Sequence, residues 1–141
     1  ITLESGAIRC RLEVSTDSDE FPAQVGWHPW FTDGGSPPAL RFTAQAMYGR
    51  DRLGLPTGDM IAPGPRPWDD CFVGVADAPI VTWRDGLSMM LSSDCDHWVV
   101  YEPEHACCVE PQSGPPDGFT LLPRIVTPER PLSRTMVMAW D

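Results

Sequence analysis

The chain has 141 residues, of which 42% are hydrophobic and 21% charged, and its formal net charge is −10. This length and composition predict one soluble globular domain, residues 1–141, with a single core. The excess of negative charge argues against phosphate backbones and anionic lipid as partners, so we expect no nucleic acid and no membrane.

The five cysteines predict a cytoplasmic protein with reduced, packed thiols. Their number is odd and no C-x-x-C pair occurs, which argues against a disulfide framework and against a zinc site. The first ten residues lack the basic and apolar regions of a signal peptide. They begin like a strand already under way, without a methionine, so we expect further sequence upstream of Ile1.

Short strands are expected along the whole chain, because sixteen prolines and twelve glycines leave little room for a long helix. Residues 7–16 alternate apolar and charged side chains, which is the period of a half-buried strand. Residues 78–93 indicate two strands joined at Asp85-Gly86, a typical hairpin turn. Further strand-like runs occupy residues 38–45, 97–103, 106–111 and 133–140. Strands at this spacing predict an all-β antiparallel sandwich or barrel.

Three long loops, residues 31–38, 58–70 and 110–119, are rich in Pro, Gly and Asp. Loops of this length on a rigid sheet often carry functional residues. Candidate functional residues are therefore expected in and beside these loops.

His28 stands among aromatic rings in the stretch Val25 to Phe31, "VGWHPWF". An imidazole can take up or release a proton near neutral pH, and neighbouring rings suit the C–H faces of a sugar. The alternative is a core histidine that hydrogen-bonds to the backbone. The segment predicts a sugar site with an acid–base group.

Asp69 and Asp70 follow a Pro-rich loop in "PWDDCF" and point to opposite sides if the segment is extended. A carboxylate accepts hydrogen bonds and therefore suits sugar hydroxyls, which donate them. One of the two can face a ligand while the other caps the loop. The alternative is a simple turn pair, where Asp is favoured.

Glu110 lies in "CCVEPQSGPPDGF", where the following proline predicts the end of a strand. A partly desolvated carboxylate at a strand mouth can act as a general base. The alternative is a solvated strand-end glutamate. Cys107 and Cys108 alternate faces of the same strand and are expected to pack rather than to react.

No metal or nucleotide site is expected. His97 and His105 have no carboxylate or cysteine at ligand spacing. No glycine-rich phosphate loop and no G-x-S-x-G nucleophile turn occurs.

Taken together, the segments resemble the aldose 1-epimerase (galactose mutarotase-like) family. The likeness rests on four motifs in the family's order, "GWHPWF", "LPTGD", "WDDCF" and "VYEPEHACCVEPQSGPPDGF", and spans roughly Arg11 to Phe119. The resemblance implies a galactose mutarotase-like β-supersandwich and the interconversion of α and β anomers of a free aldohexose such as galactose or glucose. It implies no cofactor.

By that resemblance His28 matches the general acid and Glu110 the general base, working from opposite sides of the sugar. Asp69 matches the ligand of a sugar hydroxyl, and Asp70 is its neighbouring candidate. Trp30 and Gln112 are expected to line the site.

The sequence also departs from the family. It has no match for a sugar-binding Arg and a second His of the family's N-terminal half, and the family fold is about twice as long. We therefore expect the C-terminal half of the sandwich, with exposed edges that pair with the N-terminal half or with a second copy. We expect this segment alone to be weak or inactive.

Three alternatives to a mutarotase remain open. A hexose-6-phosphate 1-epimerase would need cations for the phosphate, for which Arg50, Arg52 and Arg66 are candidates, against the net charge of −10. A non-catalytic carbohydrate-binding module of the same fold would not need both His28 and Glu110. A purely structural role is the third.

Overall fold

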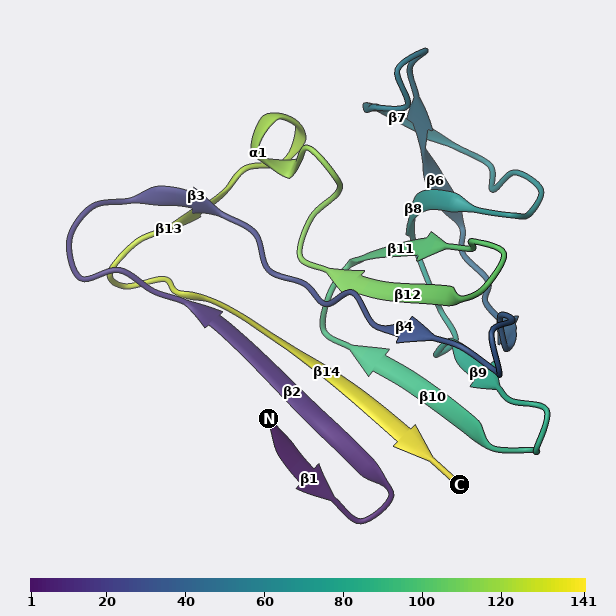
Figure 1. The fold of residues 1–141 in the computed structure, drawn as a ribbon. Coiled ribbons are helices and arrows are strands. Elements are labelled where there is room, and N and C mark those ends of the chain that lie inside the picture. The colour runs from purple at the N-terminus through teal and green to yellow at the C-terminus, as the bar shows by residue number, and fades with distance from the viewer.

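The computed structural model describes residues 1–141 and consists almost entirely of antiparallel strands (Figure 1). One six-stranded sheet has the order β1-β2-β14-β10-β9-β5. Its strands are β1 (Thr2–Glu4), β2 (Ala7–Val14), β5 (Ala39–Arg41), β9 (Ile80–Thr82), β10 (Ser88–Ser93) and β14 (Leu132–Trp140).

The second six-stranded sheet has the order β4-β12-β11-β8-β6-β7. Its strands are β4 (Trp30–Phe31), β6 (Ala46–Arg50), β7 (Pro56–Ile61), β8 (Asp69–Val73), β11 (His97–Tyr101) and β12 (Cys107–Gln112). A small third sheet pairs β3 (Phe21–Ala23) with β13 (Arg124–Val126), and α1 (Gly118–Leu121) is a single turn beside it (Figure 1). No helix has the length and apolar character needed to cross a bilayer.

The main core lies where the two large sheets face each other. Leu40, Val81 and Leu91 come from the first sheet, and their partners come from the second. Those partners are Phe31, Phe72, Trp98, Val100, Cys107 and Val109. Because side chains alternate along a strand, every second residue of β8, β11 and β12 enters this core, and the intervening ones project from the opposite face of the sheet. That outer face carries the candidate site.

The structure confirms the all-β antiparallel sandwich. The strands expected from alternation are present as β2, β5, β9, β10, β11, β12 and β14, and β9 and β10 pair across the turn at Asp85-Gly86. Within the expected loop of residues 58–70, the first residues belong to β7 and the last two open β8, which corrects that boundary. The strands β3, β4, β6 and β13 were not expected, whereas β1 agrees with the strand-like start of the chain.

Part of the first sheet is only lightly covered. β1 and β2 lie at its edge, and Leu3 and Leu12 are 78% and 38% exposed. Figure 1 shows β1, β2 and β14 running as a long ribbon beyond the second sheet, with the β3–β13 pair at one end of it.

Candidate active site

β12 places Glu110 on the outer face of the second sheet. Cys107 and Val109 point into the core, so Cys108, Glu110 and Gln112 project from the other side. Glu110 is only 3% exposed. The strand continues through Pro111 to Gln112, so Glu110 lies inside the strand and not at its end, which corrects the position expected from the sequence. This carboxylate is therefore held by a rigid, paired backbone.

The segment before β4 brings His28 to Glu110 by running antiparallel to β12. The Trp27 N–H donates to the Pro111 carbonyl over 3.1 Å, and Gly26 forms a bridge with Gln112. A Cβ on Gly26 would lie 2.9 Å from Cγ of Gln112, so the close approach requires glycine.

His28 and Glu110 are in direct contact: Nε2 of the imidazole lies 3.1 Å from Oε1 of the carboxylate. The sequence predicts that the two groups reach one sugar from opposite sides, and the structure brings the two side chains within hydrogen-bonding distance of each other. Their exposure differs, since the His28 side chain is 53% exposed and that of Glu110 is 4% exposed. The imidazole therefore faces the solvent, whereas the carboxylate is enclosed.

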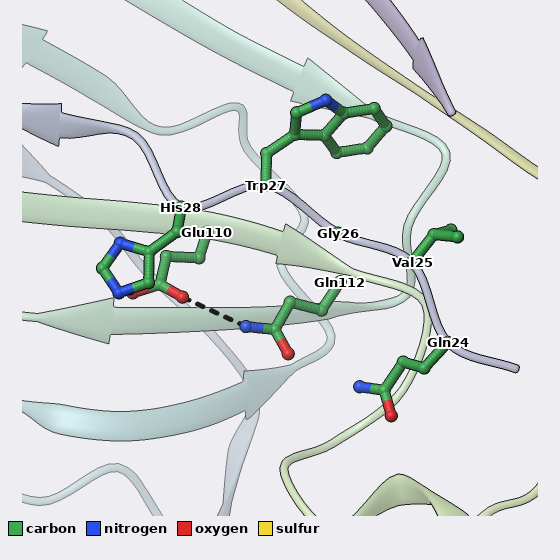
Figure 2. Close-up of a pocket in the computed structure, with 7 residues that line it drawn as sticks. All are labelled: Gln24, Val25, Gly26, Trp27, His28, Glu110 and Gln112. Atoms are coloured by element: carbon green, nitrogen blue, oxygen red, sulfur yellow. Dashed lines mark hydrogen bonds and ion pairs between the residues drawn. The ribbon is translucent and has the colours of Figure 1, made fainter. Parts of the chain in front are cut away.

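The environment of Glu110 makes it a stronger base than an ordinary carboxylate. Burial raises its pKa, while the neighbouring His28 and a hydrogen bond from Gln112 act in the opposite direction. In that bond the Gln112 amide donates from Nε2 to Oε2 over 3.1 Å (Figure 2). A carboxylate with a raised pKa takes up a proton more readily, which is what a general base requires.

Two adjoining cavities share His28, Glu110 and Gln112. One has a volume of about 270 Å³ and also touches Gln24, Val25, Gly26 and Trp27 (Figure 2). The other has a volume of about 430 Å³ and also touches Asp69, Val99, Tyr101 and Pro116. Together they reach the size of a small-molecule pocket, about 300–1,000 Å³.

Asp69 and Asp70 separate as their alternation predicts. Asp69 lines the larger cavity, and Asp70 lines neither. Arg50 joins the two, with guanidinium nitrogens 3.7 Å from Asp69 and 3.5 Å from Asp70. Arg50 therefore neutralises part of the negative charge at this edge.

Trp30 lines neither of these cavities. Its ring stacks with His28 at a centroid distance of 5.6 Å and an interplanar angle of 8°, and with His105 at 5.7 Å and 25°. Its closest link to the site is this contact with the imidazole. Of the six residues expected in the site, the cavities bring together His28, Asp69, Glu110 and Gln112.

Sequence reasoning missed Gln24 and Tyr101. Tyr101 shares the outer face of β11 with Val99, so alternation along residues 97–101 could have indicated it. Gln24 donates to the carbonyls of Gly114 and Pro115, tying the His28 segment to the loop after β12. No local pattern indicates that contact.

One group of potential metal ligands is present in this site: His28, Cys108 and Glu110 offer ligand atoms that all lie within 4.8 Å of one another. His97 does not belong to it, because its ring nitrogens bond to Asp96 and Tyr48.

Comparisons with known proteins identify solved structures that share this architecture. A scan against family models and a search of curated proteins gave no match. Three of the solved structures that match are a galactose mutarotase-like protein from Clostridium acetobutylicum, a GalM/aldose epimerase homologue from C. elegans and galactose 1-epimerase from Lactobacillus acidophilus.

The TM-scores are 0.80, 0.80 and 0.76, and the sequence identities are 17%, 13% and 14%. The match covers 99%, 98% and 96% of this chain but 54%, 57% and 53% of those chains. The chain thus has a galactose mutarotase-like fold and spans about half the length of the structures it matches.

Proposed function

We propose that the chain forms the acid–base part of a mutarotase that interconverts the α and β anomers of a free aldohexose. The observation that carries the proposal is the contact of 3.1 Å between His28 Nε2 and Glu110 Oε1 where the two cavities meet. The galactose mutarotase-like fold supports the same reaction class.

The chemistry needs two proton transfers at neighbouring oxygens. Glu110 takes the proton of the C1 hydroxyl, the bond between C1 and the ring oxygen breaks, and protonated His28 gives its proton to the ring oxygen. The open-chain aldehyde rotates about C1–C2, and the two groups then act in reverse to close the ring. Because both oxygens are bonded to C1, the two catalytic side chains must lie close together, as they do here.

The pair also fits the binding step. His28 can swing away from Glu110 because it is exposed, and the C1 hydroxyl then replaces the imidazole as the partner of the carboxylate. Asp69 in the adjoining cavity accepts a hydrogen bond from another sugar hydroxyl. Each positioned proton donor or acceptor typically contributes about 10²–10⁴-fold to the rate.

The test is the enzymatic acceleration of mutarotation of α-galactose and α-glucose, followed by polarimetry or NMR, for this chain alone and for a form extended to the full length of the matched fold. His28→Ala and Glu110→Gln should each abolish the acceleration while changing the affinity for sugar by less than about tenfold. His105→Ala and Glu104→Gln are matched controls, because both residues are exposed and line neither cavity. Retained turnover in both site variants would remove these residues from the mechanism.

The same experiment distinguishes the alternatives. A carbohydrate-binding module would bind sugar without accelerating mutarotation in either form of the chain. A hexose-6-phosphate epimerase would need a cation at the site, yet no Arg or Lys lines either cavity. Arg66 pairs with Glu102, Arg50 lies between Asp69 and Asp70, and Arg52 is exposed. This distribution favours a neutral sugar.

A further inference from the structure

Cys108 lies directly beneath the proposed acid–base pair. It precedes Glu110 by two residues on β12, so both side chains share the outer face of the sheet. Cys108 is fully buried, and its thiol is free. With His28 it completes a group of three ligand atoms, one N, one S and one O, all within 4.8 Å of one another. The proposed reaction uses the imidazole and the carboxylate but has no role for the thiol.

The geometry approaches that of a tetrahedral metal site with one open position. Zn²⁺ binds sulfur at about 2.3 Å and nitrogen or oxygen at about 2.0–2.2 Å, so its ligand atoms lie roughly 3–4 Å apart. The His28–Glu110 distance of 3.1 Å already falls in this range. The ligand atoms that are farthest apart must approach one another by about 1 Å, and a movement of the exposed imidazole of His28 can provide this. The cavity above leaves the fourth position to water.

We propose that His28, Cys108 and Glu110 bind a borderline or soft divalent cation such as Zn²⁺, and that the bound ion blocks the pocket. The mixed N, S and O donor set selects Zn²⁺ and its thiophilic analogues over Mg²⁺ and Ca²⁺, which prefer oxygen ligands alone. The ion occupies the imidazole and the carboxylate that a sugar would otherwise meet. The site therefore makes the proposed activity sensitive to free metal.

Charge balance supports such an ion. Binding transfers the thiol proton to the solvent as the sulfur–metal bond forms. One thiolate, one carboxylate and one neutral imidazole then cancel the charge of a divalent ion. A neutral centre suits this poorly solvated position.

The direct test uses Co²⁺ and Cd²⁺ as spectroscopic probes with the metal-free chain. Binding should produce the near-ultraviolet absorption of a thiolate–metal bond and should release protons, measured by calorimetry in buffers of different ionisation enthalpy. Cys108→Ser should remove the absorption band and weaken binding by more than about tenfold. Cys10→Ser, a buried free cysteine in the other sheet, is the matched control and should behave like the unsubstituted chain.

His28→Ala provides a second route if Cys108→Ser does not fold, because the exposed imidazole can be removed with little effect on packing. It should weaken binding by a similar factor, and Mg²⁺ should give no signal. Absence of the thiolate band in the unsubstituted chain, or its persistence in Cys108→Ser, would overturn the proposal. These readouts do not depend on turnover, so they are separate from the test of the mutarotase. Where turnover is measured, Zn²⁺ should inhibit it and a chelator should restore it.

Discussion

A buried hydrogen bond between Tyr48 and His97 gives a quantitative test of the sheet that supports the site. Tyr48 is 7% exposed and His97 is 4% exposed, and the Tyr48 hydroxyl lies 3.0 Å from Nε2 of the imidazole. Nδ1 of His97 lies 2.8 Å from Oδ1 of Asp96, so both ring nitrogens have a hydrogen-bond partner. Burial is the main cause that raises the pKa of Tyr48 and keeps it protonated.

The perturbation is the pair of variants Tyr48→Phe and His97→Phe, alone and combined. His97→Phe leaves the Tyr48 hydroxyl buried without a partner, and Tyr48→Phe leaves Nε2 of His97 likewise. Each unpaired buried group costs about 1–3 kcal/mol. The double variant has no unpaired group at this contact, so it should be more stable than the sum of the single effects predicts. His97→Phe also removes the contact with Asp96, but it does so whether residue 48 is Tyr or Phe, so this loss cancels from the coupling free energy.

The expected coupling free energy is about 1 kcal/mol or more, measured by urea unfolding followed through tryptophan fluorescence and linear extrapolation. The free energy of unfolding should depend on urea concentration with the same slope in the unsubstituted chain and the three variants, which would indicate that the unfolded state has not changed. Additivity of the two substitutions within about 0.5 kcal/mol would refute the hydrogen bond.

Two further predictions concern the site segment and the response to acid. Gly26→Ala should lower turnover at least tenfold, because the new Cβ would lie 2.9 Å from Gln112 and 3.0 Å from the Pro111 carbonyl and would displace the segment that carries His28. Gly64→Ala is the control, because its Cβ would meet its nearest neighbour at 3.5 Å. Equal turnover rates for the two variants would contradict the role assigned to the close approach of Gly26. Burial raises the pKa of Asp96, but hydrogen bonds and charges from His97 and Arg124 outweigh it and hold that pKa below its ordinary value. The contribution of the Asp96 carboxylate to stability is therefore present above about pH 4 and is lost as the pH falls further. The urea midpoint of unfolding should decrease less between pH 6 and pH 3 in Asp96→Asn than in the unsubstituted chain. The control variant Asp77→Asn should show the same decrease as the unsubstituted chain.

The strands that the sequence predicts well are those with a clear period of two. β2 is eight residues long and alternates from Ile8 to Val14, and the hairpin at Asp85-Gly86 has a recognisable turn. β14 is nine residues long and ends in a continuous apolar run from Met136 to Trp140, which is also typical of a strand. β1, β3 and β13 have only three residues each, which is too short for a period to appear. β6 and β7 contain glycines and lack alternation, so β6 was not expected and the residues of β7 from Gly58 onward were assigned to a loop.

The site residues likewise divide into those that the sequence pattern predicts and those that it does not. Glu110 and Gln112 share a face because they are two residues apart, and alternation alone gives that. Pro111 reads as a strand end, but its carbonyl accepts the Trp27 N–H and the strand continues. The contact between His28 and Glu110 joins segments far apart in the chain, and only the resemblance indicated it. Its closeness could not be predicted, because the distance depends on how Gly26 packs on β12.

The stacking of Trp30 on His28 and His105 gives the protein an internal optical reporter. An imidazolium in contact with an indole quenches its emission more strongly than a neutral imidazole does. The brightness of this indole therefore responds to both imidazoles, that of His28 in the site and that of His105 beside it. Light emitted by Trp30 would change whenever a sugar or an ion draws the imidazole aside, even in a molecule that completes no reaction.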